Sequence, residues 1–220
     1  MEKFLKILKE CPLFSGVESD NLEKMLNCFG AVAHQYDKNE FIFAAGDEVR
    51  SFGIVLSGSV HVVREDYWGN RFILAHIPPG GLFGEAFSFA ETVSFPVSVT
   101  AAEKTKVLLI DYRHITAACV NACGFHVSLI QNMMKILAQK NIMLTGKMEI
   151  LTHRTTRARL LAYLSEQAEK ASENPFTIPF NRQQLADYLS VERSAMSAEL
   201  SKMQSDGLIK TNKSEFELLV

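Results

Sequence analysis

A cluster of small hydroxyl residues and one arginine near the C-terminus has the types and spacing needed for chemistry on a polar surface. It lies on one side of a predicted helix over about 192–206 and comprises Arg193, Ser194, Ser197, Ala198 and Ser201. A guanidinium can donate two hydrogen bonds to O6 and N7 of guanine, and small side chains let a helix enter the major groove closely. The pattern therefore predicts a helix that reads DNA bases.

Further polar and basic side chains nearby are suited to phosphate contacts, which orient a protein on DNA without specifying its sequence. They are Arg182, Gln183, Lys202, Lys210 and Lys213. Residues 152–220 nevertheless contain nine Lys and Arg against nine Asp and Glu, and the whole chain has a net charge of -2. DNA affinity must then come from local clustering of cations rather than from bulk charge.

The elements that position this cluster form a helix-turn-helix pattern. Asn181 can cap a helix over 182–189, Ser190 and Val191 make a tight turn, and Gly207 ends the second helix. A shared apolar face is expected for Leu185, Ala186, Leu189, Val191, Met196, Leu200 and Met203. A helix over 158–171 and a strand over 176–178 precede the pattern, and segments 208–209 and 216–219 predict a small β-wing. The alternative is a helical hairpin used for protein contact, without DNA.

A long apolar stripe precedes this region. Its members follow spacings of three and four: Val127, Ile130, Met134, Leu137, Asn141, Leu144, Met148 and Leu151. This is a heptad seam, and a single Asn among apolar seam positions tends to fix register in a parallel pair. We therefore expect homodimerisation through 127–151. The alternative is a helix packed on its own β-domain, with Asn141 solvated.

Short β-branched runs with turn signals between them occupy about 32–110, after roughly 30 residues of short helical pattern. Examples are 53–56, 59–63, 72–75 and 107–110. Even spacing of such runs predicts a small barrel or sandwich. The expected domains are 1–124, 125–151 and 152–220.

The composition is that of an ordinary globular protein, with 47% hydrophobic and 22% charged residues. No apolar stretch reaches the length of about 18 residues that spans a bilayer, so we expect a cytoplasmic protein. Neither paired catalytic carboxylates, a nucleophile elbow, a P-loop nor zinc-ligand spacing is present, so we expect no enzyme activity and no metal or cofactor.

In its order of elements the chain resembles the cyclic-AMP receptor protein/FNR (CRP/FNR) family of bacterial transcription regulators. The specific pieces are Gly80-Gly-Leu-Phe-Gly-Glu85 and the segments 180–189 and 191–197. The resemblance implies an α+β chain with an N-terminal jelly roll, or double-stranded β-helix, a long dimerisation helix and a C-terminal winged helix-turn-helix. It also implies a two-fold dimer on inverted-repeat DNA, contact with RNA polymerase, and an effector site between the β-roll and the long helix.

The effector site implied by the resemblance comprises Gly84, Glu85, Phe95, Pro96, Val97, Asn141, Leu144 and Thr145. Nucleotide-binding members carry an Arg that holds the cyclic phosphate, and this sequence has Phe95 there. A buried phosphate without a cationic partner is costly, so we expect an effector other than cyclic AMP or cyclic GMP. Phe83, Phe87 and Phe89 add to an apolar pocket for a small aromatic or fatty ligand, unless these rings are simply core. Ala198 stands where many relatives have Arg, which removes one base contact.

Two sensing chemistries remain as alternatives on the same scaffold. Cys119 and Cys123 are four residues apart and could act as a thiol or metal pair, although buried structural thiols are more common. Cys11 and Cys28 are too far apart to resemble the clustered iron–sulfur ligands of the FNR branch. His76 is the nearest candidate for a haem ligand, against a structural role beside a turn.

Overall fold

The computed structural model describes residues 2–18, 21–22, 25–26, 29–116 and 125–219. Cys28, Cys119 and Cys123 lie outside the described residues. The hypothesis that Cys119 and Cys123 act as a thiol pair therefore falls outside them as well. The chain divides into two compact units. The first is Met1–Gly69 with Leu74–Lys140, and the second is Asn70–Ile73 with Asn141–Val220.

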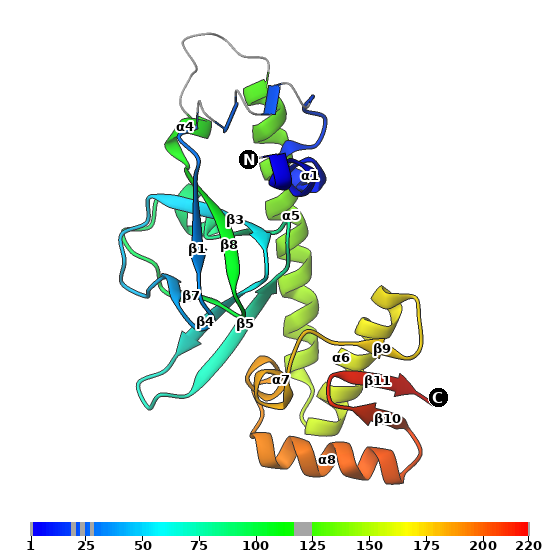
Figure 1. Ribbon diagram of the computed structural model, residues 1–220. Helices are drawn as coiled ribbons and strands as arrows, with labels where there is room; N and C mark the ends of the chain where they lie inside the picture. The colour runs from blue at the N-terminus through cyan, green and yellow to red at the C-terminus, as the bar shows by residue number, and fades with distance from the viewer. Residues whose placement is uncertain (1, 19–20, 23–24, 27–28, 117–124, 220) are drawn as a thin grey trace. The chain divides into compact units, whose positions relative to one another are not determined.

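Two four-stranded sheets form the first unit (Figure 1). One has the order β1 (Val32–Tyr36), β8 (Thr105–Asp111), β3 (Ser51–Ser57), β6 (Leu82–Phe83); the other has β2 (Phe41–Phe43), β7 (Ser98–Ala101), β4 (Val60–Glu65), β5 (Arg71–Ile77). Strands far apart in sequence pair antiparallel, as β1 does with β8 and β2 with β7. Such pairing of early with late strands in two sheets is the jelly-roll arrangement, which confirms the predicted fold class.

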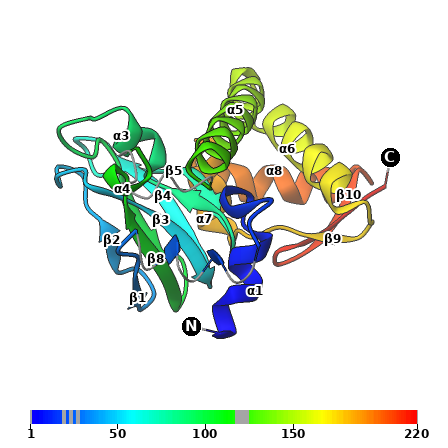
Figure 2. The same ribbon diagram turned by 90° about the horizontal axis from the view of Figure 1, so that it is seen from above.

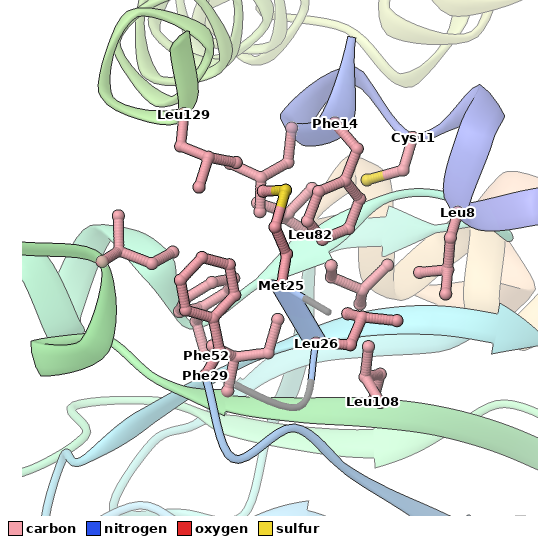
Figure 3. Packing of buried hydrophobic residues seen from close by; sticks show 14 of the residues in the cluster. Leu8, Cys11, Phe14, Met25, Leu26, Phe29, Phe52, Leu82, Leu108 and Leu129 are labelled. Carbon is pink, nitrogen blue, oxygen red and sulfur yellow. The ribbon is translucent and has the colours of Figure 1, made fainter. Parts of the chain in front are cut away.

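The main apolar core of this unit lies between the first sheet and three helical segments. These are α1 (Glu2–Glu10), the 3-10 helix η1 (Pro12–Phe14) and the long helix α5 (Phe125–Thr152). Figure 3 shows Phe14, Phe52 and Leu129 from three of these elements converging on one cluster. Asn132 of α5 adds hydrogen bonds from its amide to the carbonyls of Leu13 (3.0 Å) and Ser15 (2.9 Å). The N-terminal half of α5 is thus anchored in the β-roll unit.

The heptad stripe lies on another face of α5. The buried positions of α5 are Leu129, Asn132, Met133, Ile136 and Ile150, and none of them belongs to the stripe. The stripe leaves six members exposed, among them Val127 (62%), Met134 (66%) and Met148 (66%), while Leu137 and Leu151 are half-buried. The helix therefore packs on its own β-domain through one set of residues and leaves the predicted seam free.

The second unit contains the winged helix-turn-helix. Its helices are α6 (Thr156–Ala171), α7 (Arg182–Leu189) and α8 (Arg193–Ser205), and its sheet has the order β10 (Ile209–Asn212), β11 (Glu215–Leu218), β9 (Phe176–Thr177). Strands β9 and β10 of this sheet are visible beside α6 in Figure 2. The side chains of the predicted shared face are buried, except Val191, which is half-buried. Among the described residues, no helix is long and apolar enough to cross a membrane.

Candidate nucleic-acid interface and effector site

Recognition helix α8 begins with a side-chain cap. The Glu192 carboxylate accepts a hydrogen bond from the Ala195 amide (2.8 Å) and another from the Ser194 hydroxyl. These hydrogen bonds hold the pKa of Glu192 below its usual range, and the hydrogen bond from the Ser194 hydroxyl has the largest effect. A charged cap suits the positive end of the helix dipole and fixes where the helix starts. Arg193, the first helical residue, therefore has a defined position.

The predicted reading face of α8 is exposed as expected. Three serine hydroxyls along it donate to the helix backbone: Ser197 to the Arg193 carbonyl (2.9 Å), Ser201 to Ser197 (3.1 Å) and Ser205 to Ser201 (3.1 Å). The lone pairs of these oxygens stay available to accept hydrogen bonds. The Arg193 guanidinium makes no hydrogen bond or ion pair within the described chain, so it is free to donate.

Three of the expected phosphate contacts are engaged inside the unit, and two of these, Arg182 and Gln183, lie at the start of α7. Arg182 donates to the Thr211 hydroxyl (2.8 Å) and lies 5.0 Å from the ring centre of Phe216, and burial lowers its pKa. It joins α7 to the wing. Gln183 donates to Asp187 (2.8 Å). Arg182 and Gln183 thus already have local hydrogen-bond partners, which a phosphate would have to replace.

The remaining cations differ in availability. Lys210 pairs with Glu217 across the wing at 3.1 Å. Lys202 and Lys213 are exposed and have no side-chain partner among the residues described. With Arg193, they are the free cations of the expected interface.

Two arginines that the sequence patterns do not single out hold the helix-turn-helix in place. Arg157, in the first turn of α6, pairs with Glu199 (2.5 Å) and Asp206 (2.7 Å), at and just beyond α8. Arg159 donates to the carbonyls of Leu189 and Ser190, both at 3.1 Å, where α7 ends. A cation in the first turn of a helix opposes the helix dipole. An arginine at this unfavourable position in α6 is the signal in the sequence that its side chain has a partner elsewhere in the fold.

The expected effector site is built around a tight corner between β6 and α3 (Glu85–Phe89). Gly84 has φ 80°, and an added Cβ would lie 3.2 Å from Phe43 and 3.4 Å from Phe95. Both the backbone and the space therefore require glycine. Glu85 follows at once and is only 2% exposed.

The Glu85 carboxylate pairs with Lys140 of α5. Lys140 Nζ lies 2.6 Å from Glu85 Oε1 and donates to the Leu82 carbonyl at 2.7 Å. Glu85 Oε2 is buried and accepts no hydrogen bond from the residues that the structure describes. Lys140 is not among the residues implied by the resemblance. The expected helix residues Asn141, Leu144 and Thr145 are exposed and belong to the second unit.

Aromatic rings surround the position where nucleotide-binding relatives carry Arg. Phe95 is buried and stacks on Phe43 with ring centres 4.6 Å apart, and Phe87 meets it edge-on at 5.9 Å. Val97 is buried beside it in sequence, whereas Pro96 is exposed. Phe89, expected in the same pocket, packs instead near Phe52 and Tyr112 in the main core. Of the two alternatives left open for these rings, the core one therefore holds for Phe89, and its placement in the pocket was wrong.

The other residues considered for sensing, Cys11 and His76, are packed in the β-roll unit. Cys11 is buried, and burial raises the pKa of its thiol to about 11, so it is a poor nucleophile. His76 lies on β5 with its ring centre 5.3 Å from that of buried His61. In the described part of the chain, no three His, Cys, Asp or Glu side chains are grouped to hold a metal ion.

The half-buried position of His76 predicts a pH dependence. Burial lowers its pKa from the ordinary value of 6.5, against a smaller opposing effect of Glu103. Below about pH 6.5 the unfolded chain takes up a proton that the folded chain resists, so the free energy of unfolding should fall as pH drops. Urea unfolding at pH 7.5 and 5.5 measures this fall in the free energy of unfolding. The fall should be smaller for His76→Gln than for the natural chain. The exposed His34→Gln control should behave as the natural chain, and an identical loss in all three would contradict the assignment.

Comparison with known proteins gives matches over both units. Residues 33–121 match the cyclic nucleotide-binding domain, and residues 158–219 match the Crp-like helix-turn-helix domain. The transcriptional activator protein FnrA of Stutzerimonas stutzeri is 25% identical over 187 residues, which cover 83% of this chain and 74% of that protein. The CRP-like protein Clp of Xanthomonas oryzae is 25% identical over 186 residues, covering 80% and 78%.

Solved structures share the fold. CLP of Xanthomonas campestris, described as a c-di-GMP responsive global regulator, superposes with a TM-score of 0.77 at 19% identity, covering 92% of this chain and all of the other. FixK2 of Bradyrhizobium japonicum gives 0.69 at 22% identity, with 86% and 92% covered. The two domain models together account for well over half of the chain, in the order that the structure shows. The chain belongs to the CRP/FNR family of DNA-binding transcription regulators.

Proposed function

We propose that this regulator is a homodimer that binds an inverted-repeat DNA site through α8, under the control of a small effector that is not a cyclic nucleotide. The observation that carries the proposal is the surface of α8, where Arg193 and Lys202 are free while Glu192, Glu199 and Asp206 are engaged by local partners. An apparently neutral domain thus presents unpaired cations to a polyanion. Contact with RNA polymerase belongs to the same proposal.

Arg193 is the residue expected to specify a base. Its side chain is free and follows the capped start of α8, the end of a recognition helix that meets base edges in this motif. Arg193→Ala should relax one guanine position and cost about 1–3 kcal/mol of binding free energy. Competition binding with all four bases at each half-site position measures this. Lys213→Ala is the matched control, expected to weaken all sequences alike; an unchanged base preference in Arg193→Ala would exclude Arg193 as a reader.

Dimerisation is supported by the free heptad stripe on α5. Six of its members are exposed although a different face of the same helix is buried in the β-roll unit. Large apolar patches on a regulator's surface mark an interaction site, and a heptad repeat fits a second copy of the same helix. Two recognition helices related by a two-fold axis require half-sites about one helical turn apart.

The effector proposal rests on the charges and rings around Glu85. Lys140 is already bound to Glu85 and to the Leu82 carbonyl, and Phe95 with Phe43 fills the place of a phosphate-binding Arg. These surroundings favour an uncharged, mainly apolar ligand that donates a hydrogen bond to Glu85 Oε2. Calorimetry with cyclic AMP, cyclic GMP and cyclic di-GMP, the last because CLP responds to it, should give no micromolar binding. Micromolar binding of any of the three would contradict the proposal.

A selection from a randomised duplex library at low salt tests the DNA-binding proposal. It is run with and without a small-molecule cell extract. Enrichment of an inverted repeat supports a dimeric reader, and a difference between the two runs supports an extractable effector. If neither run enriches a sequence, the sequence-specific part of the proposal is wrong and a protein-contact role for the helix-turn-helix takes its place.

A further inference from the structure

Recognition helix α8 carries one carboxylate and is followed directly by another, and both are bound by a single arginine of a different helix. We infer that Arg157 is a positioning residue for DNA binding, because it neutralises Glu199 and Asp206 and holds α8 against α6. The inference rests on the proposed DNA-binding function of α8. It assigns a role to a residue that need not touch DNA.

The geometry is that of a fork between two acids. Arg157 Nε lies 2.5 Å from Glu199 Oε1, and its Nη1 lies 2.7 Å from Asp206 Oδ2. The two carboxylates stand seven residues apart, about 10 Å along a helix, and one planar guanidinium spans them. The Glu199 side chain is 20% exposed and that of Asp206 47% exposed, so both remain within reach of solvent and of an approaching polyanion.

The position of Glu199 gives its charge a direct effect on binding. It follows Arg193 by six residues, about 9 Å along the helix axis. At about 50 mM salt the screening length is about 14 Å, longer than this separation, so a bare carboxylate there repels the phosphates that the start of α8 must approach. Asp206 adds a second charge at the other end of α8. Without Arg157, the two acids would oppose the free cations Arg193 and Lys202.

Arg159 provides a comparison on the same turn of α6. It binds the carbonyls of His153, Leu189 and Ser190 and, among the residues that the structure describes, no carboxylate. Its role is to hold the end of α7 by hydrogen bonds to the backbone. Loss of Arg159 therefore loosens the helix-turn-helix without exposing an acid, whereas loss of Arg157 does both.

The test measures DNA affinity of full-length variants on the site selected by the natural chain, at about 50 and 300 mM salt. Arg157→Ala should weaken binding about tenfold at the lower salt and about twofold at the higher, since added salt screens the released charges. Adding Glu199→Gln and Asp206→Asn to Arg157→Ala should restore most of the loss. With Arg157 kept, Glu199→Gln/Asp206→Asn should bind more tightly than the natural chain. Arg159→Ala should lose affinity equally at both salts, and circular dichroism checks that each variant is folded.

Each result decides between two roles. Rescue by the neutral variants, with a loss that shrinks as salt rises, supports charge neutralisation. A loss that salt does not alter and that the neutral variants do not rescue means that Arg157 is only a structural clamp, and it overturns the inference. Unchanged binding of Arg157→Ala overturns it as well. If the natural chain selects no DNA sequence, it is the proposed function that fails.

Discussion

Lys140→Met is expected to lower the free energy of unfolding of the β-roll unit by about 3 kcal/mol, the low end of the cost of breaking a buried ion pair. The substitution leaves Glu85, which is 2% exposed, without its cation, and removes the hydrogen bond to the Leu82 carbonyl. The Lys140 side chain is 30% exposed, so water reaches part of the site and reduces the penalty. Urea unfolding followed by circular dichroism measures the loss.

A double-mutant cycle separates the missing charge from the missing packing. Glu85→Leu/Lys140→Met replaces both charges by apolar groups and also removes the buried Oε2 atom, so its stability should return to within about 1 kcal/mol of the natural chain. Lys170→Met breaks the exposed pair with Glu166 on α6 and should cost no more than about 0.5 kcal/mol. A loss below about 1 kcal/mol for Lys140→Met, or a double variant as unstable as the sum of the single ones, would show that the pair contributes little.

The helix-turn-helix could be predicted closely because its signals are local. Asn181 caps α7 in a capping box with Gln184, and the bounds of α7 agree with the predicted 182–189. Gly207 has φ 73° just after α8, as the end of that helix requires. Apolar spacing within each helix gave the buried face, since periodicity depends on neighbours only three or four residues away.

The effector corner could be predicted only in part because its contacts join distant segments. Glu85 and Lys140 are 55 residues apart. The same reason hides one contact of the helix-turn-helix, since Arg157 and Glu199 are 42 residues apart. A long flexible side chain has no sequence signal for its partner. Phe89 was misplaced for a different reason. Residues 85–89 form a helix rather than a strand, so Phe87 and Phe89, two residues apart, point to nearly opposite sides.

The seam on α5 was predicted from spacing alone, and its exposure in the structure permits a sharp test of the dimer. Leu144→Glu should turn the dimer into a monomer at micromolar concentration. In a two-fold pair, the substitution removes two apolar side chains, each worth about 1.5–3 kcal/mol on burial, and sets two like charges near each other. A loss of several kcal/mol corresponds to a dissociation constant raised at least about a thousandfold. Sedimentation velocity at protein concentrations of roughly 1 to 50 micromolar measures the proportions of monomer and dimer.

The fold of the variant chain should be intact, because Leu144 is 57% exposed and a charge there stays in contact with water. Its urea unfolding should therefore match that of Gln139→Glu, a control that adds the same charge at an exposed α5 position outside the stripe. DNA binding should separate the two variants further. A monomer carries a single recognition helix. The Leu144→Glu variant should therefore bind the full inverted repeat no more tightly than a single half-site, whereas Gln139→Glu should still prefer the repeat. A natural chain that sediments as a monomer, or a Leu144→Glu dimer that still prefers the repeat, would show that the exposed stripe is not the dimer seam.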